Sequence, residues 1–210
     1  MEHIKRYHRH VRQGKNGPIA IEGPIPPETL RDYRLHDDLD AFRRPKEQHA
    51  ALVEISELPE GRIIAAVDGD TVVGYVTFHY PDELERWSEG GMDDLVELGA
   101  IEVADDYRGQ GISKALLATA FEAGQLDNVI VYTTEYYWHW DLENSGLSVW
   151  QYREMMENLM KTVGMVWFAT DDPEICAHPA NCLMVRIGPD VPLASAEKFD
   201  KVRFRQRFMY

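Results

Sequence analysis

One stretch of the chain, residues 95–124, most constrains the fold, because it joins an apolar strand to an amphipathic helix through a short glycine-rich loop. Gly109 and Gly111 let the main chain turn tightly and approach a ligand without a Cβ in the way. The N–H groups of residues 109–112 would then converge at the positive end of the helix that begins near Ser113, where a phosphate or diphosphate is stabilised. Arg108 adds a positive charge. The stretch therefore predicts an anion-binding loop attached to a sheet.

Hydrophobic periodicity in the rest of the chain predicts a mixed sheet with helices. We expect strands at residues 18–25, 62–67, 71–80, 95–103, 129–134, 165–170 and 183–187, and helices at residues 27–36, 46–58, 113–124 and 149–162. The Asp68-Gly69 pair between two β-rich runs indicates a hairpin. The predicted fold class is α/β, of the α+β kind, with a mixed central sheet of six to seven strands flanked by about four helices.

The two ends of the chain differ from this central part, so we divide it into residues 1–17, 18–190 and 191–210. Residues 1–17 are polar and basic with three histidines, His3, His8 and His10, and we expect a frayed arm there in preference to a metal site. The last part interleaves Phe199, Val202, Phe204 and Phe208 with Lys201, Arg203, Arg205 and Arg207. Such a tail either docks on the domain or binds an acidic partner.

Composition narrows the classes of function. With 44% hydrophobic residues the 210-residue chain can bury one good core, and its net charge of −14 disfavours nucleic acid and anionic membranes as partners. No apolar run reaches the roughly 20 residues of a membrane helix, so we expect a cytoplasmic protein. Cys176 and Cys182 are too few for a disulfide scaffold. The two cysteines and His178 could be zinc ligands, but a fourth ligand at matching spacing is missing, so we expect no metal.

The loop sequence, Arg108 to Ser113, resembles the coenzyme A motif of the Gcn5-related N-acetyltransferase (GNAT) family: Gln or Arg, two residues, Gly, one residue, then Gly or Ala. Ser113 departs from the last position. The element order of residues 18–188 also resembles the GNAT fold. A more specific resemblance, to protein-lysine acetyltransferases of acetoin utilization, spans nearly the whole chain. It rests on IEGPI at 21–25, LPEGRII at 58–64, LGAIEV at 98–103, TTEYYWHWDL at 133–142, WFATDDPEIC at 167–176, HPANCLM at 178–184 and FMY at 208–210.

These resemblances imply acetyl-CoA as co-substrate and a protein lysine as acceptor, namely the active-site lysine of acetyl-CoA synthetase, which acetylation switches off. The family places a main-chain N–H near Val103 to polarise the thioester carbonyl. The expected coenzyme-binding residues are Ile101, Val103, Arg108, Gly109, Gln110, Gly111, Ile112, Ser113 and Lys114. Two alternatives remain: acetylation of a small polyamine-like amine, which the negative charge would also suit, and a non-catalytic acyl-CoA-binding regulator.

A lysine amine must lose a proton before it attacks a thioester, and the strand offers Glu97 and Glu102 as bases. In a regular strand the two face opposite sides, although a bulge would exchange the faces. Counting back from Val103 to the family's usual glutamate favours Glu97, and a water relay is the third option. The family's usual acid, a tyrosine, is replaced by Met160. Tyr152 is our main candidate, with Tyr136 and Tyr137 as others, unless the thiolate leaves without help.

The densest aromatic run of the chain is Tyr136, Tyr137, Trp138, His139 and Trp140. Five consecutive rings cannot all lie on one buried face, so some must be exposed or cover an opening. One interpretation is a strand end with one or two rings packed inward. The other is a wall for the acceptor lysine, in which the rings and Glu135, Asp141 and Glu143 hold the aliphatic stem and its ammonium.

Overall fold

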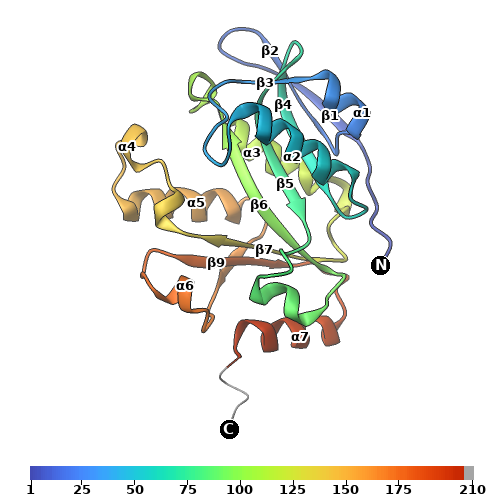
Figure 1. The fold of residues 1–210 in the computed structure, drawn as a ribbon, viewed down its shortest axis with the longest axis vertical. Helices are drawn as coiled ribbons and strands as arrows, with labels where there is room; N and C mark the ends of the chain where they lie inside the picture. The colour runs from blue at the N-terminus through green and yellow to red at the C-terminus, as the bar shows by residue number, and fades with distance from the viewer. Residues whose placement is uncertain (206–210) are drawn as a thin grey trace. The chain divides into compact units, whose positions relative to one another are not determined.

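A computed structural model describes residues 1–205 of the protein, which divides into two compact units (Figure 1). Unit 1 comprises Met1–His79 and Leu98–Gln125. Unit 2 comprises residues 80–97 and the chain from residue 126 onward. The long strand β6, Leu95–Val103, contributes its first three residues to unit 2 and the remainder to unit 1.

Unit 1 is a mainly antiparallel sheet with helices on both faces. Its elements are β1 (His8–Gln13), β2 (Pro18–Gly23), α1 (Pro27–Asp32), β3 (Arg34–Leu35), α2 (Pro45–Glu57), β4 (Arg62–Asp68), β5 (Thr71–His79), η2 (Asp105–Tyr107), α3 (Ile112–Ala120) and η3 (Glu122–Gly124). The strands follow the order β1-β2-β4-β5-β6, with β3 parallel to β5. Figure 1 shows α2 in front of these strands and α3 behind them. Each helix buries its apolar stripe on the sheet.

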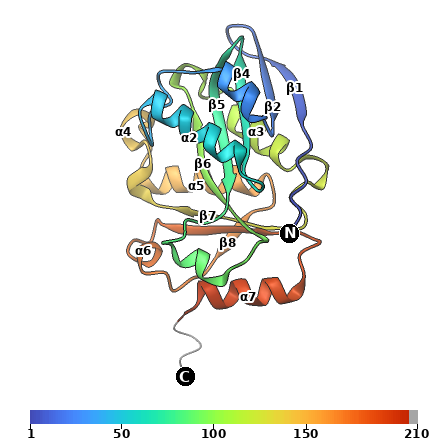
Figure 2. The same ribbon diagram turned by 45° about the vertical axis from the view of Figure 1, so that its right-hand side comes forward.

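Unit 2 continues from the first residues of β6. Its elements are η1 (Arg86–Gly90), β7 (Ile130–Glu135), η4 (Tyr137–His139), α4 (Leu142–Ser145), α5 (Val149–Lys161), β8 (Val166–Phe168), α6 (Pro173–Cys176), β9 (Cys182–Ile187) and α7 (Leu193–Arg203). β6 pairs with β7 in parallel, and β9 lies antiparallel between β7 and β8. Figure 2 shows α5 on one side of these strands and α7 on the other.

Each predicted strand and helix has a counterpart in the structure. The apolar positions from which they were predicted are the ones that the fold buries. The Asp68-Gly69 hairpin joins β4 to β5 as expected, with Asp68 paired to Thr71. Helix α5 begins at a capping box in which Ser148 and Gln151 satisfy each other's main-chain N–H groups. Within residues 1–205 the strands number nine, against six to seven predicted, because β1 and the two-residue β3 are added.

Two local predictions are wrong, and one helix was not predicted. The predicted helix at residues 27–36 ends at Asp32, since Arg34 and Leu35 pair with β5 as β3. Residues 1–17 are not a frayed arm throughout, because His8–Gln13 pair along their whole length with β2. Residues 193–203 form α7, which the interleaved apolar and basic residues did not reveal. The division of the chain at residues 17 and 190 stays a prediction.

The apolar side of α7 packs on unit 2. Phe199 is fully buried, with its ring centroid 6.1 Å from that of Trp87 in η1, and Trp87 lies 5.1 Å from Tyr132 of β7. Val202 joins the same core. The tail therefore docks on its own unit as far as Arg205, while Arg207 and Phe208 lie outside the described residues.

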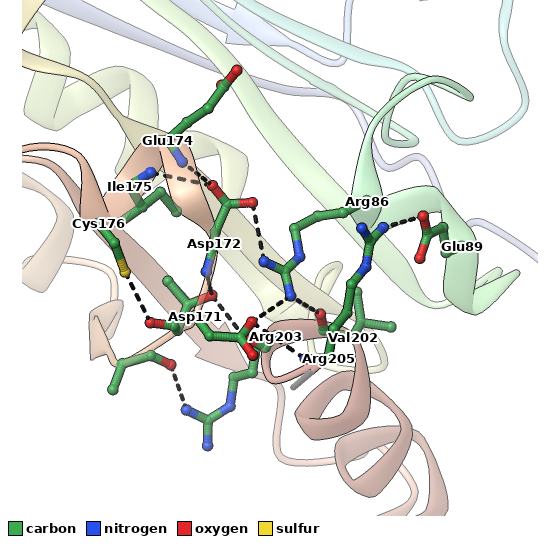
Figure 3. Close-up of polar contacts among 12 residues, drawn as sticks. Arg86, Glu89, Asp171, Asp172, Glu174, Ile175, Cys176, Val202, Arg203 and Arg205 are labelled. Atoms are coloured by element: carbon green, nitrogen blue, oxygen red, sulfur yellow. Dashed lines mark hydrogen bonds and ion pairs between the residues drawn. The ribbon is translucent and has the colours of Figure 1, made fainter. Parts of the chain in front are cut away.

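A buried arginine fastens this helix to the rest of unit 2 (Figure 3). Arg86 donates to Asp171 at 2.7 Å, to Asp172 at 3.3 Å and to the carbonyl of Val202 at 2.8 Å. Asp172 in turn caps α6 by accepting from the N–H groups of Glu174 and Ile175. One buried cation thus holds η1, α6 and the end of α7 together.

We expect Arg86→Met to lower the free energy of unfolding by about 3 kcal/mol, because removing one partner leaves two carboxylates in a site with little water. Urea denaturation at pH 7 measures the change. Arg205→Ala is the matched control: Arg205 forms an exposed ion pair with Glu89, so its loss should cost less than about 1 kcal/mol. Equal effects of the two substitutions would contradict a special role for the buried cation.

Candidate active site

The predicted anion-binding loop lies in unit 1, between the end of β6 and the start of α3. Gly109 and Gly111 have φ of 72° and 71°, left-handed values at which a side chain would be strained. Gly111 is the N-cap of α3, and among the described residues no side chain caps this end of the helix. The first N–H groups of α3 are therefore available to an anion, at the positive end of the helix dipole.

The side chains around the loop have distinct positions. Ser113 is partly exposed and Lys114 is exposed, in the first turn of α3, whereas Ile112 is buried. Arg108 turns back toward β6, where it donates to the carbonyl of Val103 at 3.1 Å and pairs with Asp105 at 3.0 Å. Its guanidinium thus fixes the exit of the strand while its side chain stays 42% exposed. Ile101 is partly buried and Val103 is buried.

Main-chain carbonyls of the loop are held by a residue that the sequence did not single out. Arg12 of β1 donates to the carbonyl of Gln110 at 2.5 Å and to that of Gly111 at 2.9 Å. The Gln110 side chain accepts from the N–H of Lys15 at 2.8 Å and donates to the carbonyl of Asp106 at 3.1 Å. No pattern in residues 1–17 predicts these contacts, because the partners lie about a hundred residues apart.

Glu102, the second candidate base, belongs to unit 1 and is 7% exposed. The Tyr75 hydroxyl donates to one carboxylate oxygen at 2.6 Å and the N–H of Ala41 donates to the other at 2.9 Å. Burial raises the pKa of Glu102, and these two hydrogen bonds oppose that rise. Both oxygens already bind groups of the protein, so this carboxylate ties β6 to β5 and to the segment before α2.

Glu97, the first candidate base, lies in unit 2 in register with Tyr132 of β7. Burial raises its pKa to about 8, and the nearby carboxylates of Glu85 and Asp82 add to the rise. The Tyr132 hydroxyl is its polar neighbour, and burial raises the pKa of that phenol far above its usual range. Glu97 is partly exposed, so its proton can reach a ligand or solvent. A carboxyl group with this pKa can gain or lose a proton near neutral pH.

The aromatic run at residues 136–140 splits into an inner and an outer part. Tyr136 packs against the core of unit 2 and stacks on Trp138 at 4.8 Å, whereas Trp138 is 49% exposed. His139 is also exposed. Tyr137 lies over His178, with 4.2 Å between ring centroids. As expected, some of the five rings are exposed.

Trp140, the last ring of the run, contacts a buried carboxyl group. It stacks on Tyr152 of α5 at 5.3 Å and donates through Nε1 to Glu135 at 3.1 Å. Burial raises the pKa of Glu135 to about 7. Tyr152, the candidate acid, is thus placed by α5 beside Trp140. The family's usual position, Met160, is fully buried.

The three candidate metal ligands are not arranged as a site. Cys182 is buried in β9, where burial raises the pKa of its thiol to about 12, whereas Cys176 is exposed and donates to the carbonyl of Thr170. His178 is taken up by the stack with Tyr137. Within residues 1–205 no three His, Cys, Asp or Glu side chains are grouped to hold a metal, and no helix there has the length and apolarity to cross a membrane.

Comparison with known proteins agrees with this geometry. Residues 31–137 match the acetyltransferase (GNAT) family. The acetoin utilization proteins AcuA of Bacillus subtilis (strain 168) and Bacillus licheniformis are 59% and 57% identical over 210 residues, and each alignment covers 100% of both chains.

A solved structure extends the similarity to three dimensions. The crystal structure of an acetoin utilization protein from Exiguobacterium sibiricum 255-15 aligns with a TM-score of 0.96 at 52% identity, covering 99% of this chain and 98% of that one. The resemblance read from the glycine loop and the predicted fold class are confirmed. The protein is an acetyltransferase, and it belongs to the GNAT family, whose members take the acetyl group from acetyl-CoA.

Proposed function

We propose that this acetyltransferase modifies a protein lysine, and that its acceptor is the active-site lysine of acetyl-CoA synthetase, which is thereby inactivated. The observation that carries the reaction type is the position of Glu97 in β6, partly exposed and beside Tyr132, where burial raises its pKa to about 8. A base of that pKa is matched to taking a proton from an ammonium group near neutral pH. The choice of acceptor is supported by the full-length similarity to acetoin utilization proteins.

The proposed reaction gives one task to each of the groups described above. Acetyl-CoA supplies the acyl group as a thioester. The N–H groups of residues 109–113 and the positive end of α3 would bind the coenzyme's diphosphate, with Lys114 nearby and Ile101 and Val103 on the strand that leads to it. Glu97 would take the proton of the acceptor ammonium, and the exposed ring of Trp138 would hold the aliphatic stem of the lysine. Tyr152 remains our candidate for returning a proton to the thiolate.

The net charge of −14 also suits a second candidate function, acetylation of a small cationic amine, because such a substrate would be attracted to the protein. Incubation with labelled acetyl-CoA and a cell extract separates the alternatives. We expect one labelled protein, acetyl-CoA synthetase, and no label on a synthetase whose active-site lysine is replaced by arginine. A labelled small amine would support the second candidate. Coenzyme binding without transfer would indicate a non-catalytic regulator.

We expect Glu97→Gln to lower kcat/KM by about 10²-fold or more, because proton transfer by a positioned base contributes that much. In the wild type, activity should fall as the pH drops below about 8, since protonated Glu97 cannot accept a proton. This limb of the pH profile should vanish in the variant. Glu102→Gln is the control and should keep the limb, because both oxygens of Glu102 already bind protein groups. Loss of the limb in Glu102→Gln alone would transfer the role to Glu102.

We expect Trp138→Ala to raise KM for the acceptor protein about tenfold while leaving the Kd for coenzyme A within twofold. The ring is half exposed and stacked on Tyr136, so it offers an apolar face without being needed in the core. Trp167 of β8, 53% exposed, provides a matched substitution that should change neither constant. Steady-state kinetics and calorimetric titration measure the two quantities. If affinity for the acceptor and affinity for coenzyme A fell equally, Trp138 would be needed for the fold and not for acceptor binding.

A further inference from the structure

We propose that Arg12, in the N-terminal strand β1, is a positioning residue for the coenzyme: it holds the main chain at residues 110–112 so that two N–H groups point toward the bound diphosphate. This inference rests on the proposed function, because it takes the loop before α3 to be the diphosphate site. It adds to that function a part of the chain, residues 8–15, that the family's glycine motif does not include.

Arg12 contacts the loop through two hydrogen bonds to main-chain oxygens. Nη2 donates to the carbonyl of Gln110 at 2.5 Å, and Nη1 donates to the carbonyl of Gly111 at 2.9 Å. Hydrogen bonds from a charged donor are about twice as strong as neutral ones. The carbonyl of Gly111 also accepts from the N–H of Ala115 at 3.2 Å, which is the first helical bond of α3. Arg12 thus acts at the junction between loop and helix.

Peptide geometry converts these contacts into a direction for the N–H groups. A trans peptide is planar, so its C=O and N–H bonds point to opposite sides. The carbonyl of Gln110 shares a peptide with the N–H of Gly111, and the carbonyl of Gly111 shares one with the N–H of Ile112. Because Arg12 holds both oxygens, both N–H groups point away from β1. They are two of the donors that the sequence assigns to the anion.

The orientation of these peptides needs a contact from outside the loop, because glycine leaves the main chain free to rotate. Gly109 and Gly111 adopt left-handed φ values, and no heavy atom lies within 4 Å of where a Cβ on Gly109 would be. A peptide flanked by glycine can flip at little steric cost. In a flipped loop a carbonyl oxygen would face the diphosphate and repel it. Arg12 opposes that flip by fixing the oxygens on the other side.

Strand β1 is itself held firmly enough to serve as an anchor. It pairs with β2 from His8 to Gln13, and Arg9 and Tyr7 bind the buried carboxylate of Glu22 at 2.9 and 2.8 Å. The turn after β1 makes a second link to the loop, from the N–H of Lys15 to Gln110. Within the strand, His10 lies 2.6 Å from Glu122, just beyond α3. β1 therefore contacts the chain before and after α3.

The test compares Arg12→Ala with Lys15→Ala, using coenzyme A as the titrant in isothermal calorimetry. Lys15→Ala removes the same charge from the same hairpin but keeps the main-chain N–H that binds Gln110. We expect Arg12→Ala to raise the Kd for coenzyme A about tenfold and Lys15→Ala to change it less than twofold. Arg12→Lys, which keeps a charged donor, should recover part of the loss. At saturating acetyl-CoA, kcat of Arg12→Ala should stay within twofold of the wild type.

Amide hydrogen exchange of the ligand-free proteins provides a readout that does not depend on coenzyme binding. We expect faster exchange at Gly111 and Ile112 in Arg12→Ala, with exchange in α2 unchanged as evidence of an intact fold. Unchanged coenzyme affinity and unchanged exchange in Arg12→Ala would overturn the proposal, as would equal weakening by Lys15→Ala. If the wild type failed to bind coenzyme A, the proposed function would fall while the exchange data still decided whether Arg12 holds the loop.

Discussion

A charged side chain that leaves water needs a partner, and in this protein the partners come from distant segments of each unit. In unit 2, Arg86 draws Asp171 and Asp172 to η1 and so fastens α7. In unit 1, the buried carboxylate of Glu22 accepts hydrogen bonds from Arg9, Tyr7 and Tyr33. Without these contacts, strand β1 and helix α7 would be bound less stably to the rest of their units.

Glu97 differs from these structural carboxylates in its surroundings. Its charged neighbours are themselves acidic, Glu85 and Asp82, so burial and repulsion act in the same direction on its pKa. Glu102, by contrast, has a hydrogen-bond donor on each oxygen. Two glutamates of one strand therefore have different environments: Glu102 is satisfied by hydrogen-bond donors, and Glu97 is flanked by carboxylates. A carboxyl group that is costly to ionise is a poor contributor to stability and a suitable base.

The sequence predicted those parts of the fold that local pattern determines. Apolar periodicity located the strands and helices of the two units, Asp68-Gly69 located the hairpin, and Gly109 and Gly111 located the loop. The resemblance to the family favoured Glu97 over Glu102 as the base, and that choice stays a prediction. Strand β1 was missed because it lies at an edge, with Val11 59% exposed, and depends on pairing with β2 and on Glu22 instead of on apolar alternation.

The role of Arg12 and the state of each aromatic ring could not be predicted for a related reason. The partners of Arg12 lie about a hundred residues away, and nothing in HRHVRQ distinguishes Arg12 from Arg9. The run at 136–140 required that some rings be exposed, but only packing against the core of unit 2 decides that Tyr136 turns inward while Trp138 stays exposed. Long-range contacts carry this information, and a single sequence does not contain them in readable form.

The central claim is that the loop before α3 binds the coenzyme's diphosphate through N–H groups whose direction Arg12 sets. A crystal structure of the protein with coenzyme A bound tests it most directly. The claim predicts diphosphate oxygens at about 2.7–3.2 Å from the nitrogens of Gly111 and Ile112, with Arg12 still bonded to the carbonyls of Gln110 and Gly111 on the opposite side of the loop. A diphosphate bound elsewhere, or an Arg12 that leaves these carbonyls to contact the phosphates itself, would contradict it.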